Sequence, residues 1–139
     1  MSIKITGISE LNKNISAFKS EVISILVRGA TDGAILIQND AKLNHGLNAH
    51  DMGRYRNRTT NLTNSIQATP AKIHQNSIKS EVAALVDYAA AVEQGGKIKI
   101  RKRSYRSKPY PFMFPAFEKF RSKALGFFQG LVKNIRWVS

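Results

Sequence analysis

The sequence of 139 residues predicts a single α+β domain with a long N-terminal helix, a small antiparallel sheet with a short helix, and a C-terminal amphipathic helix. Three patterns lead to this prediction. Apolar residues recur at helical spacing over 9–43, apolar and charged residues alternate within 65–108, and a second helical stripe covers 115–136. A polar, basic segment over 44–64 separates the first helix from the sheet region.

The first helix should begin at Ser9, a favourable N-cap, and end before Gly46. A helix over 9–43 would be roughly 50 Å long. A compact domain of this size has a diameter under about 40 Å. Two outcomes remain open: the helix kinks near the glycines of Gly29–Gly33, or its far end packs on a neighbouring subunit.

The segment 44–64 shows no apolar periodicity and is expected to be a long loop. Arg54, Arg56 and Arg58 alternate in it, so an extended backbone would direct all three to one side. The loop also holds two of the three histidines, and their spacing fits no zinc motif. We expect surface histidines here and no metal site.

The sheet region is read from alternation and from its glycines and prolines. Pro70 argues for an edge strand or a bulge. In chain order we expect an extended segment over 66–74, a tight turn at Gln75 and Asn76, a strand over 78–86, a short helix over 88–94, and a stop at Gly95–Gly96.

The next stretch is strongly basic. Charged and apolar residues alternate in 97–103, which predicts a strand with one charged face made of Lys97, Lys99, Arg101 and Arg103. Arg106 and Lys108 should follow in a proline-broken loop. The last helix should then begin at Pro115, a favoured first helical residue.

The formal net charge of +13 is unevenly distributed. Residues 1–50 contribute +1 and residues 51–139 contribute +12. This asymmetry suggests a polyanionic partner, with nucleic acid as the first candidate. The alternative is a basic surface that keeps the protein soluble or meets an acidic protein. Tyr105 and Tyr110 lie near the basic strand and offer stacking surfaces, but no sequence-reading motif is present. DNA contact would therefore be non-specific.

Nothing in the sequence predicts an enzyme or a cofactor. Cysteine is absent, and no phosphate-binding glycine loop, dinucleotide motif or nucleophile elbow is present. Glu93, an acid near the basic strand, more simply forms a salt bridge or a cap. No run of 18 apolar residues predicts a membrane span, and the N-terminus lacks the pattern of a secretory signal.

Three stretches carry a family resemblance. "TTNLTNSI" (Thr59–Ile66) resembles T-G-x-L-x-x-S-I, "YAAAVEQG" (Tyr88–Gly95) resembles Y-A-x-x-V-E-x-G, and "PFMFPAF" (Pro111–Phe117) resembles P-F-M-x-P-A-F at the start of a C-terminal helix. In this order, after a long amphipathic helix, they resemble the neck or tail-completion proteins of tailed bacteriophages, often called minor tail components. Thr60 departs from the pattern because it occupies the glycine position.

The resemblance implies a non-enzymatic virion protein that joins head and tail as a ring, commonly of six subunits, beside other neck and tail proteins and the packaged DNA. It implies assembly in the host cytoplasm. The motif residues would then have structural roles, with Glu93 bonding an inter-subunit donor and Phe117 helping to seal the start of the last helix. They are Leu62, Ser65, Ile66, Tyr88, Ala89, Val92, Glu93, Gly95, Pro111, Phe112, Met113, Pro115, Ala116 and Phe117.

The residues alone leave a second hypothesis open. The chain could be a non-specific nucleic-acid-binding protein that uses its basic strand and loop as a monomer or dimer. Under either hypothesis the candidate contact residues are Arg54, Arg56, Arg58, Lys97, Lys99, Arg101, Arg103, Arg106 and Lys108.

Overall fold

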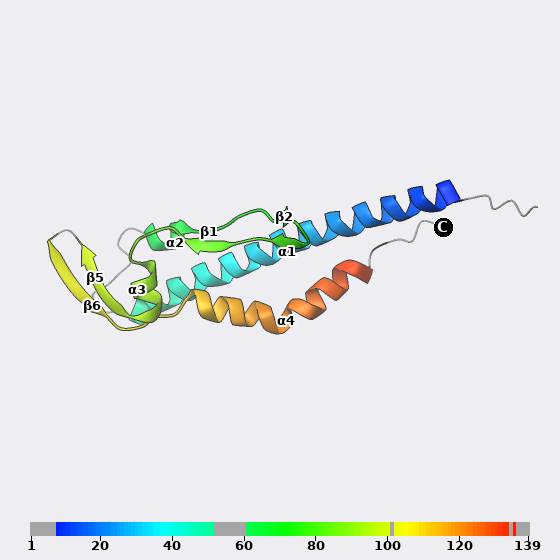
Figure 1. The fold of residues 1–139 in the computed structure, drawn as a ribbon. Coiled ribbons are helices and arrows are strands. Elements are labelled where there is room, and N and C mark those ends of the chain that lie inside the picture. The colour runs from blue at the N-terminus through cyan, green and yellow to red at the C-terminus, as the bar shows by residue number, and fades with distance from the viewer. Residues whose placement is uncertain (1–7, 52–60, 101, 134, 136–139) are drawn as a thin grey trace, which may run out of the picture.

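The computed structural model describes residues 8–51, 61–100, 102–133 and 135, which form an elongated α+β fold (Figure 1). The predicted fold class is confirmed: a long N-terminal helix, small antiparallel sheets, a short helix and a C-terminal helix. In chain order the elements are α1 (Ile8–Asp51), α2 (Asn61–Ser65), β1 (Ile66–Ala68), β2 (Lys72–His74), β3 (Ser77–Lys79), β4 (Val82–Ala84), α3 (Ala89–Gln94), β5 (Gly96–Ile100), β6 (Arg103–Ser107) and α4 (Met113–Lys133).

The helix α1 is the axis of the molecule. Its 44 residues run without interruption through Gly29–Gly33, which at 1.5 Å per residue gives a length of about 66 Å. Figure 1 shows that its N-terminal part extends past the end of α4, the overhang expected of a straight helix. Ile15 in this part is 55% exposed, and every residue from Asn12 to Ala17 is exposed. The overhang therefore presents apolar surface that the described chain does not cover.

Gly29 and Gly33 of α1 lie against α4. A Cβ on Gly29 would overlap Leu131, and a Cβ on Gly33 would lie 2.7 Å from the Phe120 ring. Since Gly29 meets the later of these two residues, α4 runs antiparallel to α1, as Figure 1 also shows. A side chain at either position would force Leu131 or the Phe120 ring to move. The two glycines of "GATDG" therefore allow α1 and α4 to pack closely.

The end of α1 corrects the sequence-based boundary. The helix continues to Asp51, so the expected loop over 44–64 is helical at both described ends and includes α2. Glycine in a helix costs only about 1 kcal/mol relative to alanine, which nearby contacts outweigh at Gly46. Asn44 donates from its amide to the Phe112 carbonyl at 3.2 Å, and His45 lies 2.8 Å from the Thr63 hydroxyl. These contacts hold the extra turns.

The strands pair as three separate antiparallel two-stranded sheets, β1–β4, β2–β3 and β5–β6. The first two form one long ribbon, interrupted at Pro70 on one strand and at residues 80–81 on the other. Pro70 lies between β1 and β2 rather than within a strand, so the expected extended segment over 66–74 and the expected single strand over 78–86 are both divided here. Gln75 and Asn76 form the predicted turn, in which Gln75 adopts a φ of 48°.

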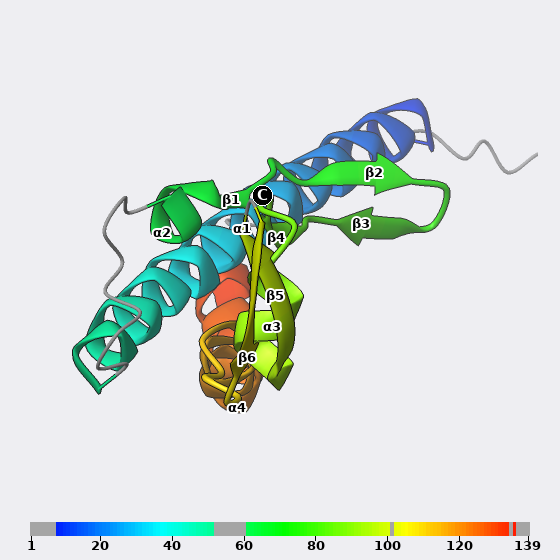
Figure 2. The same cartoon turned by 90° about the vertical axis from the view of Figure 1, so that its left-hand side faces the viewer.

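The ribbon lies on the side of α1 opposite α4, and β2–β3 projects to one side (Figure 2). Two side chains of α1 hold it there. Gln38 accepts from the Ala68 amide at 2.7 Å, and the Thr31 hydroxyl accepts from the Ala71 amide at 3.0 Å. The strands β2 and β3 remain exposed except for the half-buried Ile78.

The core lies where the C-terminal half of α1 meets α2, α3, β5 and the start of α4. Its buried side chains are Ala41, Leu62, Ile66, Ala89, Val92, Ile98, Phe112 and Ala116. Six of these eight come from the three motif stretches, which are far apart in the sequence. The motifs therefore build one shared core.

Two further corrections concern α4. The helix begins at Met113, before Pro115, and its described helical residues end at Lys133 rather than at 136. Proline is tolerated early in a helix, because the first-turn amides have no partner within the helix. Phe117 is 51% exposed, so it does not seal the start of the helix, and the buried Ala116 occupies the core position instead.

Candidate functional site

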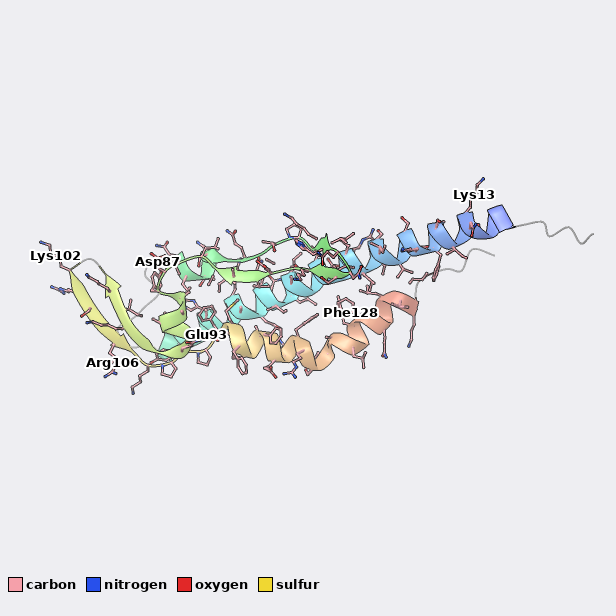
Figure 3. All side chains as sticks on the ribbon, in the orientation of Figure 1. Lys13, Asp87, Glu93, Lys102, Arg106 and Phe128 are labelled. Carbon is pink, nitrogen blue, oxygen red and sulfur yellow. The ribbon has the colours of Figure 1, made fainter. Side chains whose placement is uncertain are left out.

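The hairpin β5–β6, called the basic hairpin below, forms one end of the molecule. Figure 3 places Lys102 and Arg106 at this end and Lys13 at the other. The sequence predicted one strand over 97–103 followed by a loop, but the first strand ends at Ile100 and a second strand spans Arg103–Ser107. Pairing across the ladder satisfies the backbone of β5, and the prolines that suggested a loop follow the end of β6.

The basic hairpin has two different faces. Ile98 is 4% exposed and belongs to the core, which anchors β5 to the body of the protein. Lys97 and Lys99 alternate with it and are exposed, as are their register partners Arg106 and Ser104. These four residues are called the cationic face. It combines two ammonium groups, a guanidinium and a hydroxyl.

The charges of the cationic face have no carboxylate partner among the described residues. Salt bridges join Lys119 to Asp40 and Arg121 to Glu118, both away from the hairpin. Lys97 stands directly opposite Arg106 in the register. Like charges directly opposite each other destabilise a strand pair, so the unliganded hairpin carries an electrostatic cost.

An open depression of about 380 Å³ lies on this face. It is lined by Gly96, Lys97, Ser104 and Arg106. The lysine, arginine and serine of this lining supply hydrogen-bond donors that suit an anion with several oxygens, such as a phosphate or a carboxylate.

The base of the hairpin is fixed by α3. The helix ends at Gly95, whose φ of 76° suits glycine, and β5 starts at the next residue. After β6 the chain returns, and the Tyr110 amide donates to the Val92 carbonyl at 2.8 Å. Both ends of the hairpin are thus tied to one short helix.

Glu93 is the link between α3 and α4. Its carboxylate accepts from the amide of Phe112 (2.7 Å), which precedes α4. It also accepts from the amides of Met113 (2.9 Å) and Phe114 (2.8 Å), the first two residues of α4. A negative charge at a helix N-terminus satisfies free amides and stabilises the helix dipole. Glu93 therefore bonds within its own chain, which corrects the expected inter-subunit bond.

The structure brings together some of the predicted contact residues. Lys97, Lys99 and Arg106 share the cationic face. Arg103 was expected on the same strand as the lysines, but it begins β6 opposite Ile100. Lys108 follows β6. The predictions for Arg54, Arg56, Arg58 and Arg101 lie outside the described residues.

The remaining motif residues have structural places. Ser65 donates from its hydroxyl to the Leu62 carbonyl at 2.8 Å, Tyr88 precedes α3 as its N-cap residue, and Met113 packs against the core. Pro111 and Pro115 are exposed around the start of α4. These positions support the expectation that the motifs are structural.

His45 corrects the expectation of surface histidines. It is 4% exposed, its Nδ1 lies 2.8 Å from the Thr63 hydroxyl, and its ring meets Phe112 edge-on at 5.5 Å. Burial lowers its pKa below the usual value of 6.5 because the charged ring would lose hydration. Within the described part of the chain, no cluster of three or more His, Cys, Asp or Glu residues could hold a metal ion.

Sequence reasoning missed Ser104 on the cationic face and a second surface on α4. Ser104 could have been found only from the ladder, since its place depends on pairing with Lys99. Phe114, Phe117, Leu125 and Val132 are exposed by 63%, 51%, 73% and 47%. Their helical spacing places them along one side of α4, called the α4 apolar edge. The spacing was present in the sequence, but the predicted helical stripe over 115–136 included only Phe117 of these four residues.

Comparisons with family models, curated proteins and solved structures give no match for this chain. Of the helices that the structure describes, none combines the length and apolarity needed to cross a membrane.

Proposed function

We propose that this protein is a structural, non-enzymatic component of a bacteriophage virion. It forms a ring at the neck or head-proximal end of the tail, where it completes the tail and joins it to the head. The other neck and tail proteins are its neighbours, and assembly takes place in the host cytoplasm. The proposal extends the resemblance carried by the three motif stretches.

The observation that carries this proposal is apolar surface left without a partner on two elongated elements. The overhang of α1 exposes Ile15, and the α4 apolar edge exposes four large side chains, Leu125 among them. An exposed apolar stripe such as the α4 apolar edge marks an interaction surface. The two surfaces are different, as head-to-tail contacts in a closed ring require.

The convergence of the motifs supports the same proposal. Residues as distant as Leu62, Val92 and Phe112 build one core. A shared core gives these motif residues structural roles, as the resemblance implies. It also leaves the overhang, the β2–β3 hairpin and the cationic face of the basic hairpin outside the core, and therefore available for contacts with neighbours.

The test is the composition of particles purified from lysates of cells that carry this gene. Mass spectrometry and labelling with a specific antibody should find the protein in intact particles, with the label at the head–tail junction. Absence from tailed particles would reject the proposal.

The second candidate is a non-specific nucleic-acid-binding protein that acts as a monomer or dimer. The cationic face favours it, since three cations without a local acid suit a polyanion. The same particle experiment separates the two: this candidate predicts that the protein co-purifies with nucleic acid outside particles.

A further inference from the structure

The cationic face carries positive charges with no negative side chain paired to them among the described residues. Lys97 and Arg106 are direct register partners, and Lys99 follows on the same face opposite Ser104. No acidic side chain pairs with these three cations among the described residues. A bound anion would convert the repulsion between Lys97 and Arg106 into two attractions, so the site is suited to a ligand with negative oxygens.

The composition of this face favours a phosphate backbone over an acidic protein. Its described side chains are two lysines, a serine and an arginine, without an apolar residue. Protein interfaces take most of their affinity from buried aromatic and apolar anchors, which are absent here. Phosphate oxygens need only lysine, arginine and hydroxyl donors, which are present.

The lack of stacking groups among the described side chains of the cationic face favours a double helix over a single strand. Single-strand sites add aromatic platforms for the bases. Tyr110 is half-buried against the core, and Tyr105 is the register partner of Ile98 rather than of a lysine.

We propose that the cationic face binds the phosphodiester backbone of double-stranded DNA without regard to sequence, with Lys97, Lys99 and Arg106 as the phosphate ligands. This inference rests on the proposed function, in which the basic hairpin borders DNA passing from head to tail. The three phosphate ligands lie in one chain, so DNA binding is tested on the purified protein.

The experiment measures the affinity for a duplex of about 30 base pairs and arbitrary sequence as a function of salt concentration. The hairpin variant combines Lys97→Gln, Lys99→Gln and Arg106→Gln. The control variant combines Lys13→Gln, Lys19→Gln and Lys123→Gln, which are exposed and lie on α1 and α4. Both variants lose three positive charges from the +13 of the protein, so their net charges are equal.

The expected result is a difference in slope. Each phosphate contact contributes about −0.9 to the slope of log affinity against log salt concentration. The hairpin variant should lose about 3 units of slope, and the control variant less than about 1. Thermal melting without DNA should show that both variants fold, with Arg106→Gln alone as stable as the parent or more so, because it removes the like-charge pair.

Four results would overturn the proposal: no binding of the duplex at low salt, equal slope losses in both variants, tighter binding of a single strand of the same length, or equally tight binding of a polyglutamate peptide. The last would make the face an acidic-protein site. Failure here leaves the particle test intact, because a neck protein can be present in particles while its duplex binding does not depend on the hairpin.

Discussion

At the scale of single residues, Glu93 shows how one side chain connects distant parts of the chain. Its two carboxylate oxygens accept three amides around the start of α4, although the residue itself lies in α3. The same short helix ties both ends of the basic hairpin. Glu93 thus sets the relation between the core, the hairpin and α4.

Replacement of Glu93 should therefore be costly. Glu93→Ala should lower the free energy of unfolding by about 2–3 kcal/mol, because charge-assisted bonds and a favourable dipole contact are lost together. Chemical denaturation measures the change. The matched control is Glu118→Ala, whose exposed pair with Arg121 is worth less than about 1 kcal/mol. Similar costs for the two variants would contradict the capping role.

His45 predicts a dependence of stability on pH. Its pKa is lowered in the fold, so the unfolded chain binds the proton more readily. The contribution of His45 to the free energy of unfolding is complete above the unfolded pKa of about 6.5. It is lost as the pH falls from there toward the lower native pKa. Denaturation between pH 8 and pH 5 should show this loss in the parent and a flatter profile in His45→Gln. His74→Gln, at an exposed position, should keep the parent profile.

At the scale of elements, the two long helices define the architecture through close contact. Gly33→Val should lower the free energy of unfolding by about 1–2 kcal/mol, because overpacking against Phe120 exceeds the small gain in helix propensity. Gly126→Val is the matched control, since nothing lies within 4 Å of a Cβ there. An equal loss in both variants would show that the glycines have no packing role.

The sequence predicted well the elements that have a long apolar periodicity. It predicted less well the bounds and strands that depend on tertiary contacts. Both long helices follow from their apolar stripes. The end of α1 does not, because the contacts of His45 with Thr63 and Phe112 override a local stop signal. The strand β6 was missed because "RSYRS" has no alternation of its own and gains its structure from pairing with β5.

The candidate site was predictable in charge but not in shape. The seven basic residues of 97–108 are plain in the sequence. Their division between two strands, which removes Arg103 from the lysine strand and brings Arg106 opposite Lys97, needs the hairpin register. The one-sided arrangement is therefore a property of the fold.

At the scale of the whole molecule, the chain is an elongated body whose overhang and α4 apolar edge remain available to partners. Leu125→Asp should leave monomer stability within about 0.5 kcal/mol of the parent, since the side chain is 73% exposed, yet it should prevent incorporation into particles. Complementation and mass spectrometry of particles measure this. Gly126→Asp is the matched control, because this position is exposed, has open space around a Cβ and lies about 100° around the helix from Leu125, and its incorporation should be normal.

Cryo-electron microscopy of intact particles from cells that carry this gene tests directly for a structural ring at the head–tail junction. We predict a closed ring of this chain in the neck. In that ring, the α1 overhang and the α4 apolar edge would be covered by neighbouring subunits, and the basic hairpin would border the DNA channel. A neck reconstruction without this chain, or one in which both apolar surfaces remain exposed to solvent, would contradict it.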